Sequence, residues 1–171
     1  MDLKEKIRNI PDFPKEGILF RDITTLLKDA QAFQFAVDEL TRRYKDTPID
    51  IIAGIESRGF IMGTVLAYQL NKGFVPIRKP GKLPAETLSA EYSLEYGTDK
   101  IEMHVDAVKS GDKVLLIDDL LATGGTMKAA CELVERAGGQ VVECSLLIEL
   151  AALNGKEKLK GYDVYSMIVY D

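Results

Sequence analysis

The chain has 171 residues, 46% of them hydrophobic and 29% charged, which is the balance of an ordinary folded domain. Its 22 basic and 27 acidic residues give a formal net charge of −5, which argues against a broad basic surface for nucleic acid or an anionic membrane. The single histidine, His104, excludes a His-rich metal site and is assigned a structural or surface role on a strand.

Two cysteines, Cys131 and Cys144, are too few for a disulfide framework, so we interpret them as small core residues in a reducing compartment. The first six residues are charged where a signal peptide would be apolar. No apolar run approaches the ~20 residues that span a bilayer. The sequence therefore predicts a cytoplasmic protein that does not contact membranes.

The predicted elements begin with a helix capped by Asp29, along which one apolar stripe runs at helical spacing: Phe33, Val37, Leu40 and Tyr44. Short apolar runs then predict strands over 49–55, 74–77, 113–117, 140–148 and 164–169. Predicted helices cover about 60–70 and 125–136, and Gly138 and Gly139 stop the second of them. This alternation is typical of βαβ units, so we expect an α/β fold over 1–171 with a mostly parallel central sheet flanked by helices.

One segment does not fit this alternation. Residues 78–97 form a polar stretch with prolines and glycines that is too long for a normal strand-to-helix connection. Such an excursion predicts an active-site lid or a projecting hairpin. Ligands of parallel sheets bind outside the carboxyl ends of the strands, which directs attention to 56–59 and 118–126.

The strongest motif is VLLIDDLLATGGT, residues 114–126. The end of this motif can bind one anion with backbone amides, two hydroxyls and the positive end of a helix. The residues that supply these groups are Thr123, Gly124, Gly125 and Thr126. The loop lacks the lysine of nucleoside-triphosphate loops, and no G-x-G-x-x-G is present, so a monophosphate fits best. Asp118 and Asp119 are acceptors suited to the vicinal hydroxyls of a sugar; the alternative is a pair of carboxylates that only cap a strand end.

This motif resembles the phosphoribosyl-pyrophosphate-binding motif of the type I phosphoribosyltransferase family. Segments 11–14, 20–23, 56–60, 78–84 and 92–97 resemble, in the same order, the members of that family that act on adenine. The resemblance spans nearly the whole chain. It implies the type I fold with a small base-binding hood over 1–28 and a flexible catalytic lid over 78–97. It also implies conversion of adenine and phosphoribosyl pyrophosphate to AMP and pyrophosphate, with Mg²⁺, by a homodimer.

The resemblance assigns the 5′-phosphate of the substrate and of AMP to one loop: Ala122, Thr123, Gly124, Gly125 and Thr126. It assigns the ribose hydroxyls to Asp118 and Asp119. Their negative charge would favour the positive charge that develops at C1′ in an oxocarbenium-like transition state. Mg²⁺ would be held mainly by pyrophosphate and ribose oxygens, because the sequence holds no dedicated metal cage.

Pyrophosphate binding is implied for the loop Glu56, Ser57, Arg58 and Gly59, with a cis peptide expected at Glu56–Ser57 to turn amides towards the anion. Lid cations Arg78, Lys79 and Lys82 would close over pyrophosphate and exclude water. Read alone, Arg58 is a solvated residue of a helix's first turn, and the lid cations are a solvated loop.

Base selection is implied for Leu19, Phe20, Arg21 and Leu120. Phe20 would stack on the purine, and the backbone N–H and C=O of Arg21 would match adenine N1 and N6. Glu95 would act as the acid–base carboxylate near adenine N7. Without the resemblance, Glu95 would be interpreted as an exposed hairpin residue and Phe20 as a core residue. Two other functions stay open: a phosphoribosyltransferase for another nucleobase, and a non-catalytic nucleotide-sensing regulator.

Overall fold

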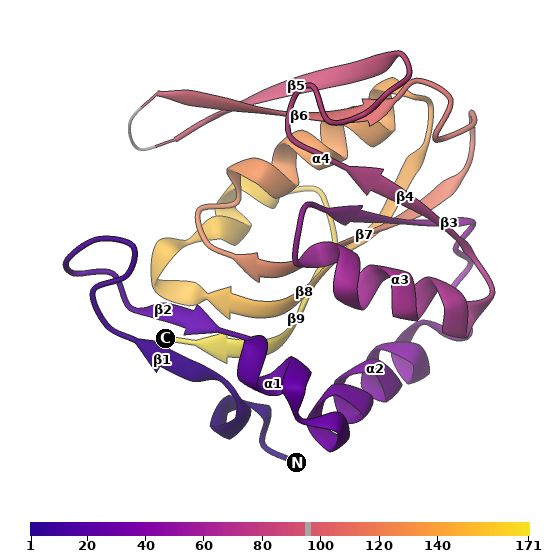
Figure 1. The fold of residues 1–171 in the computed structure, drawn as a ribbon. Coiled ribbons are helices and arrows are strands. Elements are labelled where there is room, and N and C mark those ends of the chain that lie inside the picture. The colour runs from indigo at the N-terminus through magenta and orange to yellow at the C-terminus, as the bar shows by residue number, and fades with distance from the viewer. Residues whose placement is uncertain (95–96) are drawn as a thin grey trace. The chain divides into compact units, whose positions relative to one another are not determined.

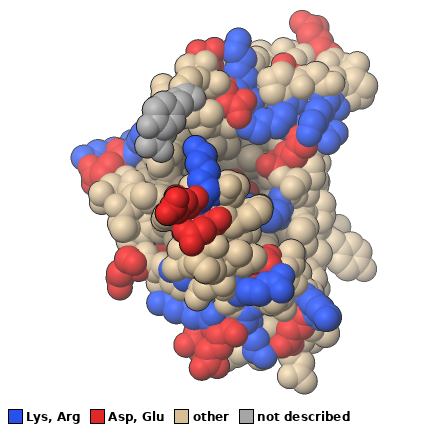
Figure 2. Space-filling view, turned by 60° about the vertical axis from the view of Figure 1, so that its left-hand side comes forward, with Lys and Arg blue, Asp and Glu red and all other residues tan. Residues whose placement is uncertain are grey.

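The computed structural model describes residues 1–94 and 97–171 (Figure 1). The chain forms two compact units, Met1–Lys45 and Asp46–Asp171. Within the described residues, no helix is both long enough and apolar enough to cross a membrane. On the face drawn in Figure 2, acidic and basic side chains are interspersed, as the small net charge suggests.

The first unit pairs a short β-ribbon with two helices. Its elements are η1 (Leu3–Lys6), β1 (Arg8–Ile10), β2 (Phe20–Asp22), α1 (Thr24–Lys28) and α2 (Ala30–Tyr44). Strands β1 and β2 are antiparallel, with Asn9 opposite Arg21. Asp29 caps α2 as predicted, because its Oδ1 accepts from the amides of Gln31 and Ala32, each at 3.1 Å. The predicted stripe is confirmed: Val37, Leu40 and Tyr44 are buried and Phe33 is partly buried.

The second unit contains the predicted parallel sheet and its flanking helices. Its elements are β3 (Ile51–Ile55), α3 (Gly59–Leu70), β4 (Gly73–Ile77), β5 (Thr87–Ser93), β6 (Thr98–His104), β7 (Lys113–Leu121), α4 (Gly125–Arg136), β8 (Gln140–Leu150), η2 (Ala151–Leu153), η3 (Gly155–Leu159) and β9 (Val164–Tyr170). Five parallel strands lie in the order β4-β3-β7-β8-β9. Helix α3 covers one face, and α4 with the β5–β6 hairpin covers the other (Figure 1).

Burial on both faces explains why β7 reads as a continuous apolar run. Val114, Leu115, Leu116 and Ile117 are each at most 1% exposed. Cys131 of α4 and Cys144 of β8 lie in the core on the α4 side, with their Sγ atoms 3.6 Å apart and no exposed surface. The prediction that both cysteines are core residues is therefore confirmed.

The predicted end of the central strand was wrong. The sequence placed it at residue 117, whereas β7 continues to Leu121. The reason is that pairing with β8 persists, with Leu120 opposite Ile148 and Leu121 opposite Glu149. The two aspartates thus belong to a strand of the central sheet rather than to the loop after it, and pairing with β8 holds this end of the strand in place.

Residues 87–104 form a hairpin, one of the two forms predicted for the polar excursion. Strands β5 and β6 are antiparallel, from Thr87 opposite His104 to Ser93 opposite Thr98. His104 lies on a strand, as predicted. Arg78, before the hairpin, forms an isolated antiparallel bridge with Glu102. The hairpin packs along α4, and its core residues are Ala90, Tyr92, Ile101 and Met103, whereas most of 80–86 is exposed.

Candidate active site

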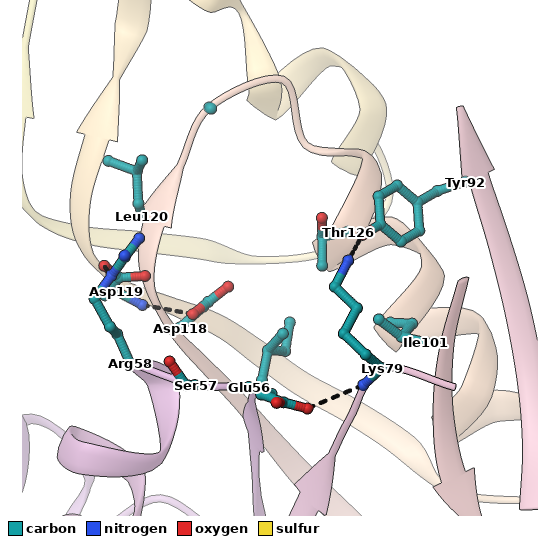
Figure 3. Close-up of a pocket in the computed structure, with 12 residues that line it drawn as sticks. Glu56, Ser57, Arg58, Lys79, Tyr92, Ile101, Asp118, Asp119, Leu120 and Thr126 are labelled. Carbon is teal, nitrogen blue, oxygen red and sulfur yellow. Dashed lines mark hydrogen bonds and ion pairs between the residues drawn. The ribbon is translucent and has the colours of Figure 1, made fainter. Parts of the chain in front are cut away.

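A cavity of about 370 Å³ opens at the carboxyl ends of β3 and β7 (Figure 3). This is where a parallel sheet is expected to bind its ligand. Segments far apart in the sequence meet there: the loop after β3, the start of the 78–97 excursion, the hairpin and the end of β7. The lining residues are Ile55, Glu56, Ser57, Arg58, Lys79, Tyr92, Ile101, Asp118, Asp119, Leu120, Ala122 and Thr126.

Gly59 brings the loop after β3 against β7. A Cβ at this position would lie 2.8 Å from the carbonyl oxygen of Ile117 and 3.0 Å from Oδ1 of Asp118, so a side chain would force the two segments apart. The peptide bond Glu56–Ser57 is cis, as expected. The close approach places Arg58 beside β7, where its Nε donates to Oδ2 of Asp119.

The two aspartates share one small region of the cavity wall. Oδ1 of Asp118 accepts the backbone amide of Asp119 at 2.8 Å, and the Asp119 side chain is only 8% exposed. Loss of water around its carboxyl group, and then the charge of Asp119, raise the pKa of Asp118 well above its usual value; Arg58 opposes this. The pair therefore favours a positively charged or hydroxyl-bearing group next to it.

Glu56 binds the segment that carries the predicted lid cations. Its Oε2 accepts from Nε of Arg78 at 3.2 Å and from the amide of Lys79 at 3.1 Å, and its Oε1 pairs with Nζ of Lys82. Burial would raise the pKa of Glu56, but hydrogen bonds from Lys82, from the Lys79 amide and from Arg78 together lower it to about 2. Glu56 is thus an ionised anchor for the cations that the sequence assigned to pyrophosphate.

Lys79 extends into the cavity towards the hairpin (Figure 3). Its Nζ lies 2.7 Å from the hydroxyl of Tyr92 and pairs with the carboxylate of Asp99. Burial would lower the pKa of Lys79, but hydrogen bonds to Asp99 and Tyr92 raise it above its usual value. The ammonium group therefore stays charged inside the cavity, where an anion could reach it.

Sequence reasoning missed Tyr92 and Ile101 as lining residues. The signal was present in the alternation of the hairpin: along β5, Ala90 and Tyr92 are buried between the exposed Glu91 and Ser93. Read as a strand rather than as a lid, this segment would have predicted one face turned towards the site.

The predicted phosphate loop is a single structural unit. Ala122 to Thr126, all five residues, surround a smaller hollow of about 90 Å³ between the end of β7 and the start of α4. Gly124 has φ of 82°, which an L side chain rarely adopts, and it stands where α4 begins. Backbone amides at this helix start suit an anion.

The remaining predicted residues lie elsewhere in the chain. Leu19, Phe20 and Arg21 belong to the first unit, where Phe20 is half-buried and meets Phe13 edge-on, with ring centroids 5.2 Å apart. Glu95 lies outside the described residues. Across 1–94 and 97–171, no group of three or more His, Cys, Asp or Glu side chains is arranged to hold a metal ion.

Comparison with known proteins identifies the family. The model of the phosphoribosyl transferase domain matches residues 24–169. Adenine phosphoribosyltransferase of Halothermothrix orenii is 61% identical over 168 residues, which cover 98% of this chain and 99% of the relative.

Two solved structures of adenine phosphoribosyltransferases extend the likeness to three dimensions. The crystal structure from Thermoanaerobacter pseudethanolicus has a TM-score of 0.96 and 55% identity, covering 99% of this chain and 98% of the other. That from Saccharomyces cerevisiae, in complex with an imino-altritol bisphosphate and adenine, has a TM-score of 0.91 and 40% identity, covering 97% and 96%. By sequence along its full length and by fold, the chain belongs to the adenine phosphoribosyltransferase family.

Proposed function

We propose that this chain transfers the phosphoribosyl group of phosphoribosyl pyrophosphate to adenine, giving AMP and pyrophosphate in purine salvage. The C1′–O bond to pyrophosphate breaks, the C1′–N9 bond forms, and the N9 proton leaves. The observation that carries the proposal is the cavity itself, which brings basic Arg58 and Lys79 together with the acidic pair and the phosphate loop. Such a site has a place for each of three groups: a phosphate at the loop, sugar hydroxyls at the acidic pair and a second anion at the two cations.

The phosphate loop, Ala122 to Thr126, would bind the 5′-phosphate through backbone amides and the hydroxyls of Thr123 and Thr126. The hollow of about 90 Å³ at the start of α4 supports this role, because amides at a helix start complement a dianion. The same group would be held in substrate and product, so this loop contributes binding rather than a change during the reaction.

Asp118 and Asp119 would accept hydrogen bonds from the ribose 2′- and 3′-hydroxyls. As the bond to pyrophosphate breaks, positive charge develops at C1′ and the ring oxygen. The raised pKa of Asp118 supports this assignment, since a carboxyl group crowded by a like charge is stabilised by an arriving positive charge. This stabilisation is greater in the transition state than in the ground state, which accelerates the reaction.

Pyrophosphate would bind Arg58, Lys79 and backbone amides of the loop 56–59. Arg78 and Lys82 would join from the lid, exchanging the carboxylate of Glu56 for the departing anion. Their present ion pairs with Glu56 support this exchange, since a more highly charged anion competes with one carboxylate for the same cations. Closure would exclude water from the activated sugar.

The base would stack on Phe20 and take apolar contacts from Leu19 and Leu120, with Arg21 reading its edge. Exposure of three large apolar residues in the chain around Phe20 supports a base-binding hood: Phe13 is 50%, Ile18 43% and Leu19 45% exposed. Stacking on an aromatic ring is worth about 1–3 kcal/mol. Glu95 would exchange a proton with the purine.

Mg²⁺ would be held mainly by pyrophosphate and ribose oxygens, with the carboxylates of Asp118 and Asp119 nearby. Carboxylate oxygens are the donors that Mg²⁺ prefers, so the residues of the cavity fit this ion. When bound, it neutralises charge on the leaving pyrophosphate. The chain's own residues orient the sugar and receive the anion.

The protein would act as a cytoplasmic homodimer without nucleic-acid or membrane partners. Helix α3 supports a second copy: along one side Ile61 is 36% and Tyr68 84% exposed, with half-buried Val65 between them. An apolar stripe of this kind favours an identical partner that covers it. Gel filtration should give about twice 18.9 kDa. Elution of the wild type at the mass of one chain would refute the dimer.

The reaction is tested by offering adenine, hypoxanthine, guanine, xanthine and orotate separately, each with Mg²⁺ and phosphoribosyl pyrophosphate. Nucleotide and pyrophosphate are quantified in each mixture. We expect AMP from adenine alone. Use of another base instead would keep the sugar site and overturn the base assignment. Binding of AMP without turnover of any base would favour a nucleotide-sensing regulator.

A further inference from the structure

The segment after β8 lies directly behind the phosphate loop. Gly155, the first residue of η3, is buried against this loop. A Cβ at Gly155 would lie 2.4 Å from the carbonyl oxygen of Ala122 and 3.2 Å from its carbonyl carbon. Real Cβ atoms do not approach backbone this closely, so no side chain fits at this position.

The contact is reciprocal. A Cβ at Gly124 would lie 2.3 Å from the carbonyl oxygen of Gly155 and 3.1 Å from its carbonyl carbon. The two glycines therefore let two backbone segments touch, one at the start of α4 and one at the start of η3. Because both contacts are backbone to backbone, a displacement of one segment is passed directly to the other.

The supporting segment is itself held in place. Nζ of Lys156 lies 2.7 Å from Oε2 of Glu149, whose side chain is 9% exposed on β8. Asn154 turns the chain into η3 with φ of 53°, and Leu159, at the end of η3, is 1% exposed in the core. One side of the segment is thus fixed to the sheet, and the other presses on Ala122 and Gly124.

We propose that Gly155 is a positioning residue for 5′-phosphate binding: the turn at 154–156 supports the phosphate loop from behind and fixes the direction of its amides. This rests on the proposed function, which gives the loop its phosphate. Gly155 does not touch the ligand. It acts through the carbonyl group of Ala122, which it faces, and through the backbone of Gly124, which faces its own carbonyl group. Moving either segment rotates the peptide planes that carry the loop's amides.

The test compares Gly155→Ala with Gly73→Ala. Gly73 is the matched control, because a Cβ there meets no atom within 4 Å and its φ is not positive. We expect Gly155→Ala to raise the KM for phosphoribosyl pyrophosphate and the Kd of AMP by about tenfold or more, since small misplacements of binding groups are costly. The KM for adenine and all constants of Gly73→Ala should stay within about twofold.

A merely structural role predicts a different pattern. It would lower the melting temperature and the active fraction, and leave the KM of the folded enzyme unchanged; that pattern, or an unchanged Gly155→Ala enzyme, overturns the proposal. If Gly155→Ala does not fold, Lys156→Met removes the ion pair with Glu149 and keeps the glycine. It should raise the same two constants by about threefold, the size expected for an ion pair whose lysine is half exposed. Unchanged constants in this variant overturn the proposal.

The proposed function fails separately from this inference. Wild-type protein that neither forms nor binds AMP would contradict the function. Wild-type protein that binds AMP, with variants that bind it equally well, would contradict only the role of Gly155.

Discussion

Arg58 and Asp119 stand 61 residues apart in the chain and form an ion pair on the wall of the cavity. The pair joins the loop after β3 to the end of β7, so the cation proposed for pyrophosphate and the anion proposed for ribose hold each other in place. A substrate that carries both pyrophosphate and ribose would replace this ion pair with two new contacts, pyrophosphate to Arg58 and ribose hydroxyls to Asp119. Preorganisation of this kind reduces the reorientation needed when the substrate binds.

Replacing both carboxylates, Asp118→Asn with Asp119→Asn, should lower kcat by about 10³-fold, because the charge that stabilises C1′ is removed. Steady-state assays with adenine measure the loss, and circular dichroism checks the fold. Asp106→Asn, an exposed carboxylate outside the cavity, serves as the control. A double variant within about tenfold of wild type would disprove the ribose assignment.

Glu56→Gln should tighten pyrophosphate binding. With the carboxylate gone, Arg78 and Lys82 no longer have to leave an ion pair before they bind the anion. We expect the Kd of magnesium pyrophosphate to fall about fivefold, the value of a half-exposed ion pair. Isothermal titration calorimetry measures it.

Glu91→Gln is the control for this experiment, because Glu91 pairs with Lys100 on the same hairpin at 3.4 Å. The Kd of magnesium pyrophosphate for Glu91→Gln should equal that for the wild type. Weaker pyrophosphate binding by Glu56→Gln would show instead that Glu56 holds the lid cations in a productive position, and the proposed exchange would be wrong.

Glu95→Gln should lower kcat by about 10²-fold and leave AMP affinity unchanged, because an amide cannot exchange a proton with the purine. Pre-steady-state turnover and equilibrium binding of AMP separate the two effects. Glu91→Gln, four residues earlier in the sequence and exposed on β5, should show wild-type turnover. An unchanged kcat in Glu95→Gln would remove this residue from the mechanism.

Asp22→Asn should destabilise the protein at neutral pH. Hydrogen bonds from the Thr24 hydroxyl and amide and then from Arg8 lower the pKa of Asp22 to about 2 from its ordinary 3.8. A lowered pKa contributes stability above pH 3.8 that is lost as the pH falls towards 2. The shift corresponds to about 2 kcal/mol.

Urea unfolding at pH 7 and at pH 3 measures this contribution. The free energy of unfolding of Asp22→Asn should fall below that of wild type by the whole contribution at pH 7 and by less at pH 3. Asp38→Asn, an exposed residue of α2, should leave the free energy of unfolding unchanged at both values. A difference that grows on acidification would contradict the argument.

The parallel sheet could be predicted because its central strands β3 and β7 are buried on both faces, which makes them continuous apolar runs. The end of β7 could not, since Asp118 and Asp119 are polar and only their pairing with β8 extends the strand. The short strand β1 escaped notice for a similar reason: it has three residues, two of them polar and exposed. Local composition does not report partners that are distant in the chain.

The candidate site was predictable where one segment carries its own chemistry, as in 122–126. It was not predictable where the contact is made between segments. Nothing near Glu56 in the sequence signals that Arg78 and Lys82 reach it, and an isolated glycine at 155 gives no sign that it faces Ala122. Such pairings depend on topology, which brings the ends of separate strands to one edge.

The buried thiols provide an internal reporter of unfolding. Cys131 and Cys144 are the chain's two cysteines, and neither has exposed surface. A water-soluble disulfide reagent can reach them only when α4 separates from β8, so the rate of modification measures how often the core opens. Because α4 begins at the phosphate loop, the factor by which a bound nucleotide slows this modification would measure how much ligand binding reduces the opening between α4 and β8.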